Sequence, residues 1–265
     1  MIAVVGIPFD EFSSFQRGTA LAPPKIREAY HSDSSNYFTE RGVDLKNHPG
    51  WKDEGDLTLP VGAEAIATIH SSVEKLLKEN SGIFSLGGDH STSYPVVKAM
   101  AKKYGPLNIL HLDAHPDLYD NFEGNKFSHA CPFARIMEEG LSRRLIQVGI
   151  RTMNLHQREQ ANHFGVEVIE MKDWNASIRF AFDGPVYLSL DMDVVDPAFA
   201  PGVSHHEPGG LTSRELISIL QNLNVNMVGA DLVEFNPTRD PSGITAMLAA
   251  KLFKEMLDLL LRSGK

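Results

Sequence analysis

Acidic and imidazole side chains follow directly after an apolar run in the segment Asn108–Asn121, which is NILHLDAHPDLYDN. Asp113, His115 and Asp117 lie two residues apart immediately after this run. In an extended chain, residues i, i+2 and i+4 point to one side, so these three side chains can face one point. Carboxylates and imidazoles are common ligands of divalent transition metals. The spacing therefore predicts a metal site at the end of a strand.

Three other apolar runs end in the same residue types. GIFSL is followed by Asp89 and His90, VYLSL by Asp191 and Asp193, and NMVGADLV by Glu234. Any one of these acids could be an N-cap or turn residue. Because open parallel sheets bind ligands beyond the carboxyl ends of their strands, the joint pattern favours one shared site. Asp89 follows a glycine pair and is expected to order its loop rather than bind metal.

Charge repulsion indicates how many metals such a site would need. Two carboxylates about 4 Å apart repel by roughly 4 kcal/mol at an effective dielectric near 20. Two divalent ions would balance the four aspartates, and His90 and His115 can complete the shells as neutral ligands. This oxygen-rich set suits Mn²⁺ and also admits Co²⁺, Ni²⁺ or Zn²⁺. Two ions about 3.5–4 Å apart can bridge a water and lower its pKa to near 7, which makes a hydrolytic nucleophile.

Other reactive side chains have more ordinary interpretations. Cys131, the single cysteine, could be the nucleophile of a Cys/His hydrolase with His129, but nothing nearby would lower its pKa, so we expect a buried structural thiol. His111 lies inside an apolar run and is expected to be a hydrogen-bonded core histidine or a support for a ligand. For His205 and His206, a pocket role and a plain loop role stay open.

The elements that must position these groups alternate along the chain. Segments of helical period separate the apolar runs, as in residues 62–80 and 248–260, and this alternation indicates a parallel sheet covered on both faces. Without a repeat or a linker-like stretch, residues 1–265 are predicted to form a single domain. The predicted strands are residues 2–7, 82–86, 107–112, 144–150, 166–170, 186–190 and 226–233.

Composition restricts the class of protein. The chain has 265 residues, 42% of them hydrophobic, and a net charge of −9, which argues against a duplex nucleic acid partner. One cysteine permits no intrachain disulfide and favours a reducing compartment. No apolar run approaches transmembrane length, and MIAVVGIPFD is expected to form a first strand rather than a signal peptide. We expect a cytoplasmic enzyme with a small-molecule substrate and no membrane partner.

Five motifs together resemble the ureohydrolase family of arginase, agmatinase and related amidinohydrolases: SLGGDHS, LDAHPD, SLDMDVVDPAFAPG, EPGGLT and LVEFNPTRDPSG. The similarity runs from GIPFDEFSS to the final helix, and the pattern is nearest to the agmatinase-like branch. The resemblance implies a three-layer α/β/α fold, a dinuclear manganese centre and a homo-oligomer, usually a trimer or hexamer.

The resemblance also implies a role for each matching residue. One metal would be held by His90, Asp113, Asp117 and Asp191. The other would be held by Asp113, His115, Asp191 and Asp193, with Asp113 and Asp191 bridging.

Beyond the metals, Glu234 matches the acid that binds the guanidinium group, and His129 matches the proton-shuttling histidine. A bridging hydroxide would attack the guanidinium carbon, Asp117 would accept its proton, and His129 would relay the proton to the leaving amine. The expected products are urea and an amine.

Some positions depart from the family pattern, although none is a metal ligand. Ala130 replaces the usual glycine after the shuttling histidine, Phe12 stands where the agmatinase-like pattern has glycine, and Gln16 stands where it has arginine. Residues 203–206, Val-Ser-His-His, replace a run similar to Thr-Gly-Thr-Pro. These positions are expected to line the pocket mouth and to affect substrate identity.

The substrate expectation comes from the segment GIRTMN. Arginases have an acid after this turn that holds the α-amino group, whereas Thr152 and Met153 offer no carboxylate. Agmatine or a guanidino acid is therefore predicted to be preferred over L-arginine. Asp120 or Glu123 could accept the far amine of agmatine, and Arg151 could hold the carboxylate of a guanidino acid. Arginase activity, formimidoylglutamate hydrolysis, a deacetylase of related fold and a non-catalytic metal-binding role are the alternatives.

Overall fold

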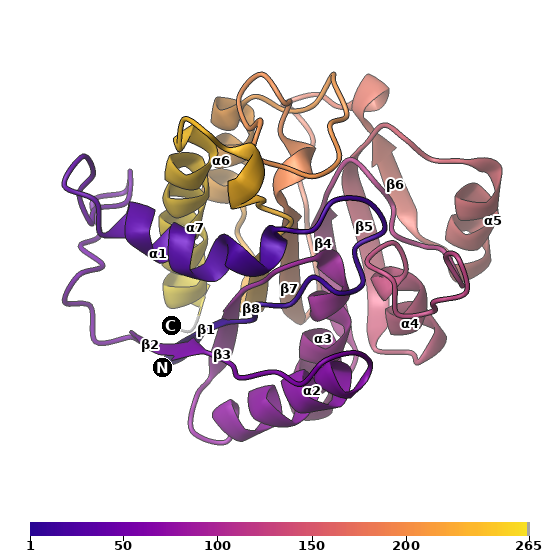
Figure 1. Ribbon diagram of the computed structural model, residues 1–265, viewed down its shortest axis with the longest axis horizontal. Coiled ribbons are helices and arrows are strands. Elements are labelled where there is room, and N and C mark those ends of the chain that lie inside the picture. Colours follow the sequence, from indigo (N-terminus) through magenta and orange to yellow (C-terminus); the bar gives the residue numbers. More distant parts are fainter. Residues whose placement is uncertain (264–265) are drawn as a thin grey trace.

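The computed structural model describes residues 1–263, and its eight strands form one sheet (Figure 1). The strand order is β2-β1-β3-β8-β7-β4-β5-β6, and all neighbouring strands run parallel. The strands are β1 (Ile2–Gly6), β2 (Trp51–Asp56), β3 (Gly82–Leu86), β4 (Leu107–Leu112), β5 (Ser142–Ile150), β6 (Glu167–Glu170), β7 (Pro185–Asp191) and β8 (Asn226–Val233).

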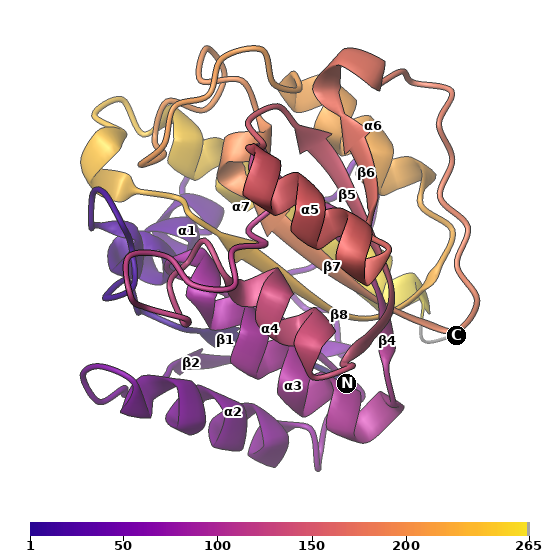
Figure 2. The ribbon, with the colours of Figure 1, turned by 90° about the vertical axis from the view of Figure 1, so that its right-hand side faces the viewer.

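Helices cover both faces of this sheet and bury a separate apolar cluster on each. The clusters have α1, α6 and α7 on one face and α2, α3, α4 and α5 on the other, and Figure 2 shows α2, α3 and α4 side by side. No helix within residues 1–263 is long and apolar enough to span a membrane. The helices are α1 (Ala22–Tyr30), α2 (Glu64–Leu76), α3 (Ser93–Tyr104), α4 (Pro132–Glu138), α5 (Leu155–Phe164), α6 (Ser213–Asn222) and α7 (Ile244–Ser263).

The apolar runs of the sequence form strands because they can be buried on both faces of the sheet. All residues of β3 and β4 are buried, as expected for strands inside a parallel sheet. All seven predicted strands are present, as are helices within residues 62–80 and 248–260, so the predicted three-layer α/β/α fold is confirmed. The single domain over residues 1–265 stays a prediction, and residues 264–265 lie outside the described part.

Four adjacent strands, in the order β3-β8-β7-β4, form the middle of the sheet. Their register aligns Leu86 with Leu232, Leu232 with Leu190, and Leu190 with Leu112. These leucines therefore form one row across the sheet, close to the carboxyl end of each strand. The acids and imidazoles that follow this row in the sequence are brought to one edge, where open α/β sheets bind their ligands.

Candidate metal centre and active site

A cavity of about 170 Å³ lies where the middle strands end. Six of the eight predicted site residues line it, and the remaining two, His90 and Asp113, are fully buried. The lining residues are Ser14, His115, Asp117, Tyr119, Phe122, His129, Ala130, Thr152, Gln157, Asp191, Asp193, His205 and Glu234.

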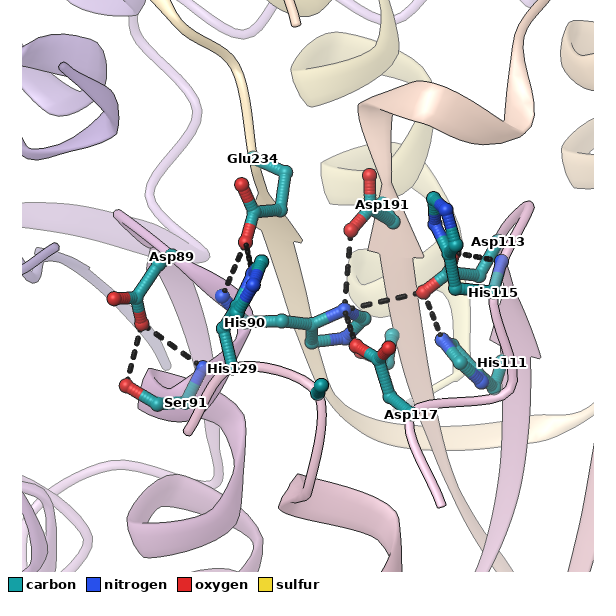
Figure 3. A network of polar contacts seen from close by, with 12 residues as sticks. Asp89, His90, Ser91, His111, Asp113, His115, Asp117, His129, Asp191 and Glu234 are labelled. Atoms are coloured by element: carbon teal, nitrogen blue, oxygen red, sulfur yellow. Dashed lines mark hydrogen bonds and ion pairs between the residues drawn. The ribbon is translucent and has the colours of Figure 1, made fainter. Parts of the chain in front are cut away.

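His90 is surrounded by three of the predicted ligands (Figure 3). Its Nδ1 atom lies 3.2 Å from Asp113 Oδ2, 3.1 Å from Asp117 Oδ2 and 3.1 Å from Asp191 Oδ2. All four residues are buried, although they come from the ends of three different strands. The four residues predicted to share one metal therefore converge on one point.

The other ring nitrogen of His90 shows how the imidazole is oriented. His90 Nε2 lies 3.0 Å from Ser189 Oγ, and the Ser189 hydroxyl donates to Asp231 Oδ1 over 2.7 Å. Ser189 Oγ must then accept a hydrogen bond from the Nε2–H group of His90, which in a neutral imidazole leaves a lone pair on Nδ1. Among the described residues this buried Nδ1 has no hydrogen-bond partner, and its lone pair faces three carboxylate oxygens. A cation bound by all four groups fits this arrangement.

His115 forms the second half of the cluster with two aspartates. Its Nδ1 atom lies 2.9 Å from Asp193 Oδ2 and 3.5 Å from Asp113 Oδ1. One ligand atom from each of these residues lies within 4.8 Å of the others, which is close enough for one ion. Asp113 presents one oxygen to each histidine, in keeping with its expected bridging position.

The backbone brings these side chains together differently from the expected extended alternation. Asp117 has a left-handed φ of 48°, so the chain turns after β4 instead of continuing as a strand. Asp193 lies in a 3₁₀ turn, Met192–Val194, that is capped by the side chain of Asp191. The predicted convergence is therefore present, but two tight turns produce it. Left-handed backbone at a non-glycine residue is strained and is common at functional sites.

Electrostatics also indicates that the cluster needs positive charge. Burial raises the pKa of Asp191 and of Asp193, and the neighbouring carboxylates raise both further. Burial opposes the charged form of His90, yet its carboxylate neighbours raise the pKa of His90 well above the ordinary value. The acids can ionise together only beside cations, either protonated imidazoles or metal ions.

Glu234 and His129 form a separate pair beside this cluster (Figure 3). Glu234 has a left-handed φ of 62°, and its Oε1 atom accepts hydrogen bonds from His90 N at 2.9 Å and His129 Nδ1 at 2.8 Å. Burial opposes both charges, but each group stabilises the other: Glu234 raises the pKa of His129 to about 9, and His129 lowers the pKa of Glu234. The geometry thus places a buried carboxylate and a hydrogen-bonded imidazole ring at the cavity wall.

Asp89, Cys131 and His111 lie close to the cluster and have the roles expected for residues that are not ligands. Asp89 caps a turn through Ser91, as expected for a residue that orders its loop. Burial raises the pKa of Cys131 to about 12, which agrees with a structural thiol. His111 donates from Nε2 to Asp113 over 2.7 Å and accepts at Nδ1 from Gln147, so it supports a predicted ligand.

Several residues expected at the pocket mouth lie elsewhere. Val203 and Ser204 are buried, and Phe12 packs against Phe9, so His205 and Ala130 are the departures that line the cavity. The Arg151 guanidinium donates to backbone carbonyls, including Asp193 O and Glu207 O, which leaves it no role with a substrate carboxylate. Asp120 and Glu123 are also absent from the cavity lining.

Sequence reasoning did not identify four residues that contact the predicted site or the side chains that support it. They are Ser14, Gln147, Ser189 and Asp231. Ser189 and Asp231 could have been suspected, because each is a polar residue inside an otherwise apolar strand. Ser14 carries no such signal, because it lies in a loop far from His129 in the sequence.

Comparison with known proteins agrees with this geometry. A profile of the arginase family matches residues 1–258. Arginase 1, mitochondrial, of Arabidopsis thaliana is 50% identical over 272 residues, covering 96% of this chain and 79% of the plant protein. Agmatinase of Bacillus cereus is 35% identical, over 97% of this chain and 90% of the bacterial protein. The solved arginase from Medicago truncatula superposes with a TM-score of 0.92 at 44% identity. The superposition covers 98% of this chain and 87% of the Medicago chain. The chain therefore belongs to the arginase family and is a dinuclear-metal ureohydrolase acting on guanidino C–N bonds.

Proposed function

We propose that this chain hydrolyses L-arginine to urea and L-ornithine. One feature of the cavity carries the proposal. Its acids, Asp117, Asp191, Asp193 and Glu234, all belong to the metal cluster or to the guanidinium end, and no other carboxylate lines it among the described residues.

The rest of the cavity wall suits a head group without net charge. Thr152 and Gln157 are neutral and polar, as are Ser14 and Tyr119. The far ammonium of agmatine would meet no acid there, and burying an unpaired charge is costly. The α-amino and α-carboxylate groups of L-arginine neutralise each other, and hydroxyl and amide groups can bind both. This argument reverses the preference inferred from the sequence alone.

Two divalent ions fit the site, and we propose Mn²⁺ for both. His90, Asp113, Asp117 and Asp191 would hold one, and Asp113, His115, Asp191 and Asp193 the other. Carboxylate-rich ligand sets suit Mn²⁺. When bound, such a pair supplies a nucleophile at neutral pH by lowering the pKa of water.

The other site residues then bind the substrate and move protons. The Glu234 carboxylate would pair with the guanidinium group, because the metals do not need its charge. Asp117 would accept a proton as the new C–O bond forms. The imidazolium of His129 would supply a proton to the nitrogen of the leaving amine as its bond to carbon breaks.

Agmatine is the second candidate, since an agmatinase is also among the relatives. That agmatinase is 35% identical, whereas the plant arginase is 50% identical, which supports L-arginine further. The test compares kcat/KM for L-arginine, agmatine and 4-guanidinobutyrate on Mn²⁺-loaded protein, with urea as the measured product. We expect L-arginine to be best by tenfold or more. A tenfold preference for agmatine would overturn the substrate assignment.

Three further properties belong to the same proposal. We propose a homo-oligomer, a trimer or hexamer, which light scattering after size-exclusion chromatography would measure. The metal identity can be tested by metal analysis of protein purified without added metal. A cytoplasmic location, supported by the single cysteine, can be tested by cell fractionation.

A further inference from the structure

Ser14 contacts the candidate proton donor from a loop distant in sequence. The Ser14 Oγ atom lies 2.8 Å from His129 Nε2, and Ser14 lines the cavity. The residue is exposed, whereas His129 is buried. Ser14 therefore lies between a buried imidazole and the space that a substrate would occupy.

The loop that carries Ser14 is held on both sides. Asp10 Oδ2 accepts a hydrogen bond from Gly18 N at 2.7 Å, and Asp89 Oδ2 accepts one from Phe12 N at 3.1 Å. The Phe12 carbonyl in turn accepts from His129 N at 3.1 Å. The contact between Ser14 and His129 is thus built into the loop, because backbone bonds fix both partners.

Both nitrogens of the His129 ring are engaged. Nδ1 donates to Glu234 Oε1 over 2.8 Å, and that carboxylate is the stronger acceptor. In the imidazolium, Nε2–H then donates to Ser14 Oγ, and the Ser14 hydroxyl proton is left free to point into the cavity. A proton that passes from His129 to the substrate must leave from Nε2, the nitrogen that contacts Ser14 Oγ.

We propose that Ser14 relays this proton to the leaving amine, a role that rests on the proposed function. As the C–N bond breaks, its electron pair takes the proton of the Ser14 hydroxyl, and Ser14 Oγ takes the proton of His129 Nε2. Ser14 ends as a neutral hydroxyl and His129 as a neutral imidazole. The proton released when water adds to the guanidinium carbon restores the imidazolium.

Ser14→Ala removes the relay, and Ser13→Ala is a matched control. Ser13 is adjacent, but its hydroxyl points to Asp89 at 3.4 Å. On Mn²⁺-loaded protein we expect Ser14→Ala to lower kcat by about 10- to 100-fold, within the range of general acid–base catalysis, and to leave KM within about twofold. Ser13→Ala should keep kcat within about twofold, and Ser14→Thr should recover most of the activity. Metal content and the thermal midpoint check that each variant is folded.

The number of protons transferred in the rate-limiting step distinguishes a relay from a merely structural contact. In mixtures of H₂O and D₂O, the relay predicts a curved dependence of kcat on deuterium fraction for the unaltered chain and a straight line for Ser14→Ala. In Zn²⁺-loaded protein, nitrogen NMR should show a lower His129 pKa in Ser14→Ala than in Ser13→Ala, because the imidazolium has lost an acceptor.

The failure of the relay is distinguishable from failure of the proposed function. If the unaltered chain releases no urea from any guanidino compound, the proposed function fails and the relay fails with it. If the unaltered chain is active and Ser14→Ala is equally active, only the relay is overturned. Equal losses in Ser13→Ala and Ser14→Ala would also overturn it, because the loop rather than the hydroxyl would then be responsible.

Discussion

Acidic residues are placed very differently in the middle of the sheet and at its edges. Asp113 and Asp191, at the ends of β4 and β7, are buried among other charges, whereas Asp53 on edge strand β2 is exposed and paired with Arg27. A buried charge costs several kcal/mol unless it is compensated, but an exposed ion pair is worth only about 0–1 kcal/mol. An acid in the middle of the sheet therefore implies a function, and an acid at the edge does not.

The largest effect expected from this comparison is that of Asp113→Ala. Asp113 presents one oxygen to each half of the cluster, so its loss should release both metals and lower turnover by more than about 100-fold. Loss of a group beyond the ligands already costs about 10–100-fold. Metal analysis and urea release measure the outcome. A variant that retains two ions per chain would contradict the bridging assignment.

Glu234→Ala should lower the activity nearly as much as Asp113→Ala, but for a different reason. Among the described residues, Glu234 forms hydrogen bonds with His129 and the backbone of His90, and with none of the predicted ligand side chains. We expect both metals to stay bound while kcat/KM falls by an amount equivalent to about 2–5 kcal/mol, as when one partner of a buried charge pair is removed. Metal content and kcat/KM are measured on the same sample, with Glu234→Asp as the charge-conserving control. Loss of a metal would show that the acid is part of the metal centre.

His129→Ala and Cys131→Ala test two residues that lie close together in one segment. His129→Ala should lower kcat by about 10²–10⁴-fold with metal content unchanged. Cys131→Ala should keep kcat within about twofold. Burial raises the pKa of the Cys131 thiol to about 12, so at pH 8 the folded chain should react with iodoacetamide far more slowly than the unfolded chain. A larger loss of activity for Cys131→Ala would favour the thiol as nucleophile.

The contrast between middle and edge also explains which parts of the structure could be predicted. The strands β3, β4, β7 and β8 are recognisable because burial on both faces requires apolar residues. Edge strand β2, WKDEGD, was missed because none of its residues is buried, so it has no apolar pattern. The other edge strand, β6, differs from β2 because Val168 and Ile169 give it an apolar pattern, although both residues are only partly buried.

Within the site, residue type and location were predictable, but contacts across distant segments were not. The convergence of His90, Asp113 and Asp191 follows from the position of each residue after a parallel strand. By contrast, the Ser14–His129 contact depends on a loop path, and the engagement of Arg151 depends on carbonyl directions after β5 and β7. Neither contact leaves a periodic signal in the sequence. The suggestion that Arg151 holds the carboxylate of a guanidino acid failed for that reason.

Asp53→Ala provides the smallest expected effect and the matched counterpart of Asp113→Ala. Asp53 accepts two hydrogen bonds from Arg27, at 2.7 and 2.9 Å, and does not line the cavity at the metal centre. Partial burial opposes ionisation of Asp53, but the hydrogen bonds from Arg27 lower its pKa. The ion pair therefore stabilises the fold above the ordinary aspartate pKa of about 3.9, and this stabilisation disappears as the pH falls through the lowered pKa.

At pH 7 we therefore expect Asp53→Ala to lower the free energy of unfolding by at most about 1 kcal/mol, as is typical of exposed ion pairs, with kcat unchanged. The difference should shrink in 1 M NaCl, where the screening length is about 3 Å. Denaturation by urea in low and high salt measures the free energy of unfolding. A separate assay of urea released from the substrate measures kcat. A loss of activity comparable to that of Asp113→Ala would break the distinction between the middle and the edge, since a solvent-exposed ion pair would then control the chemistry.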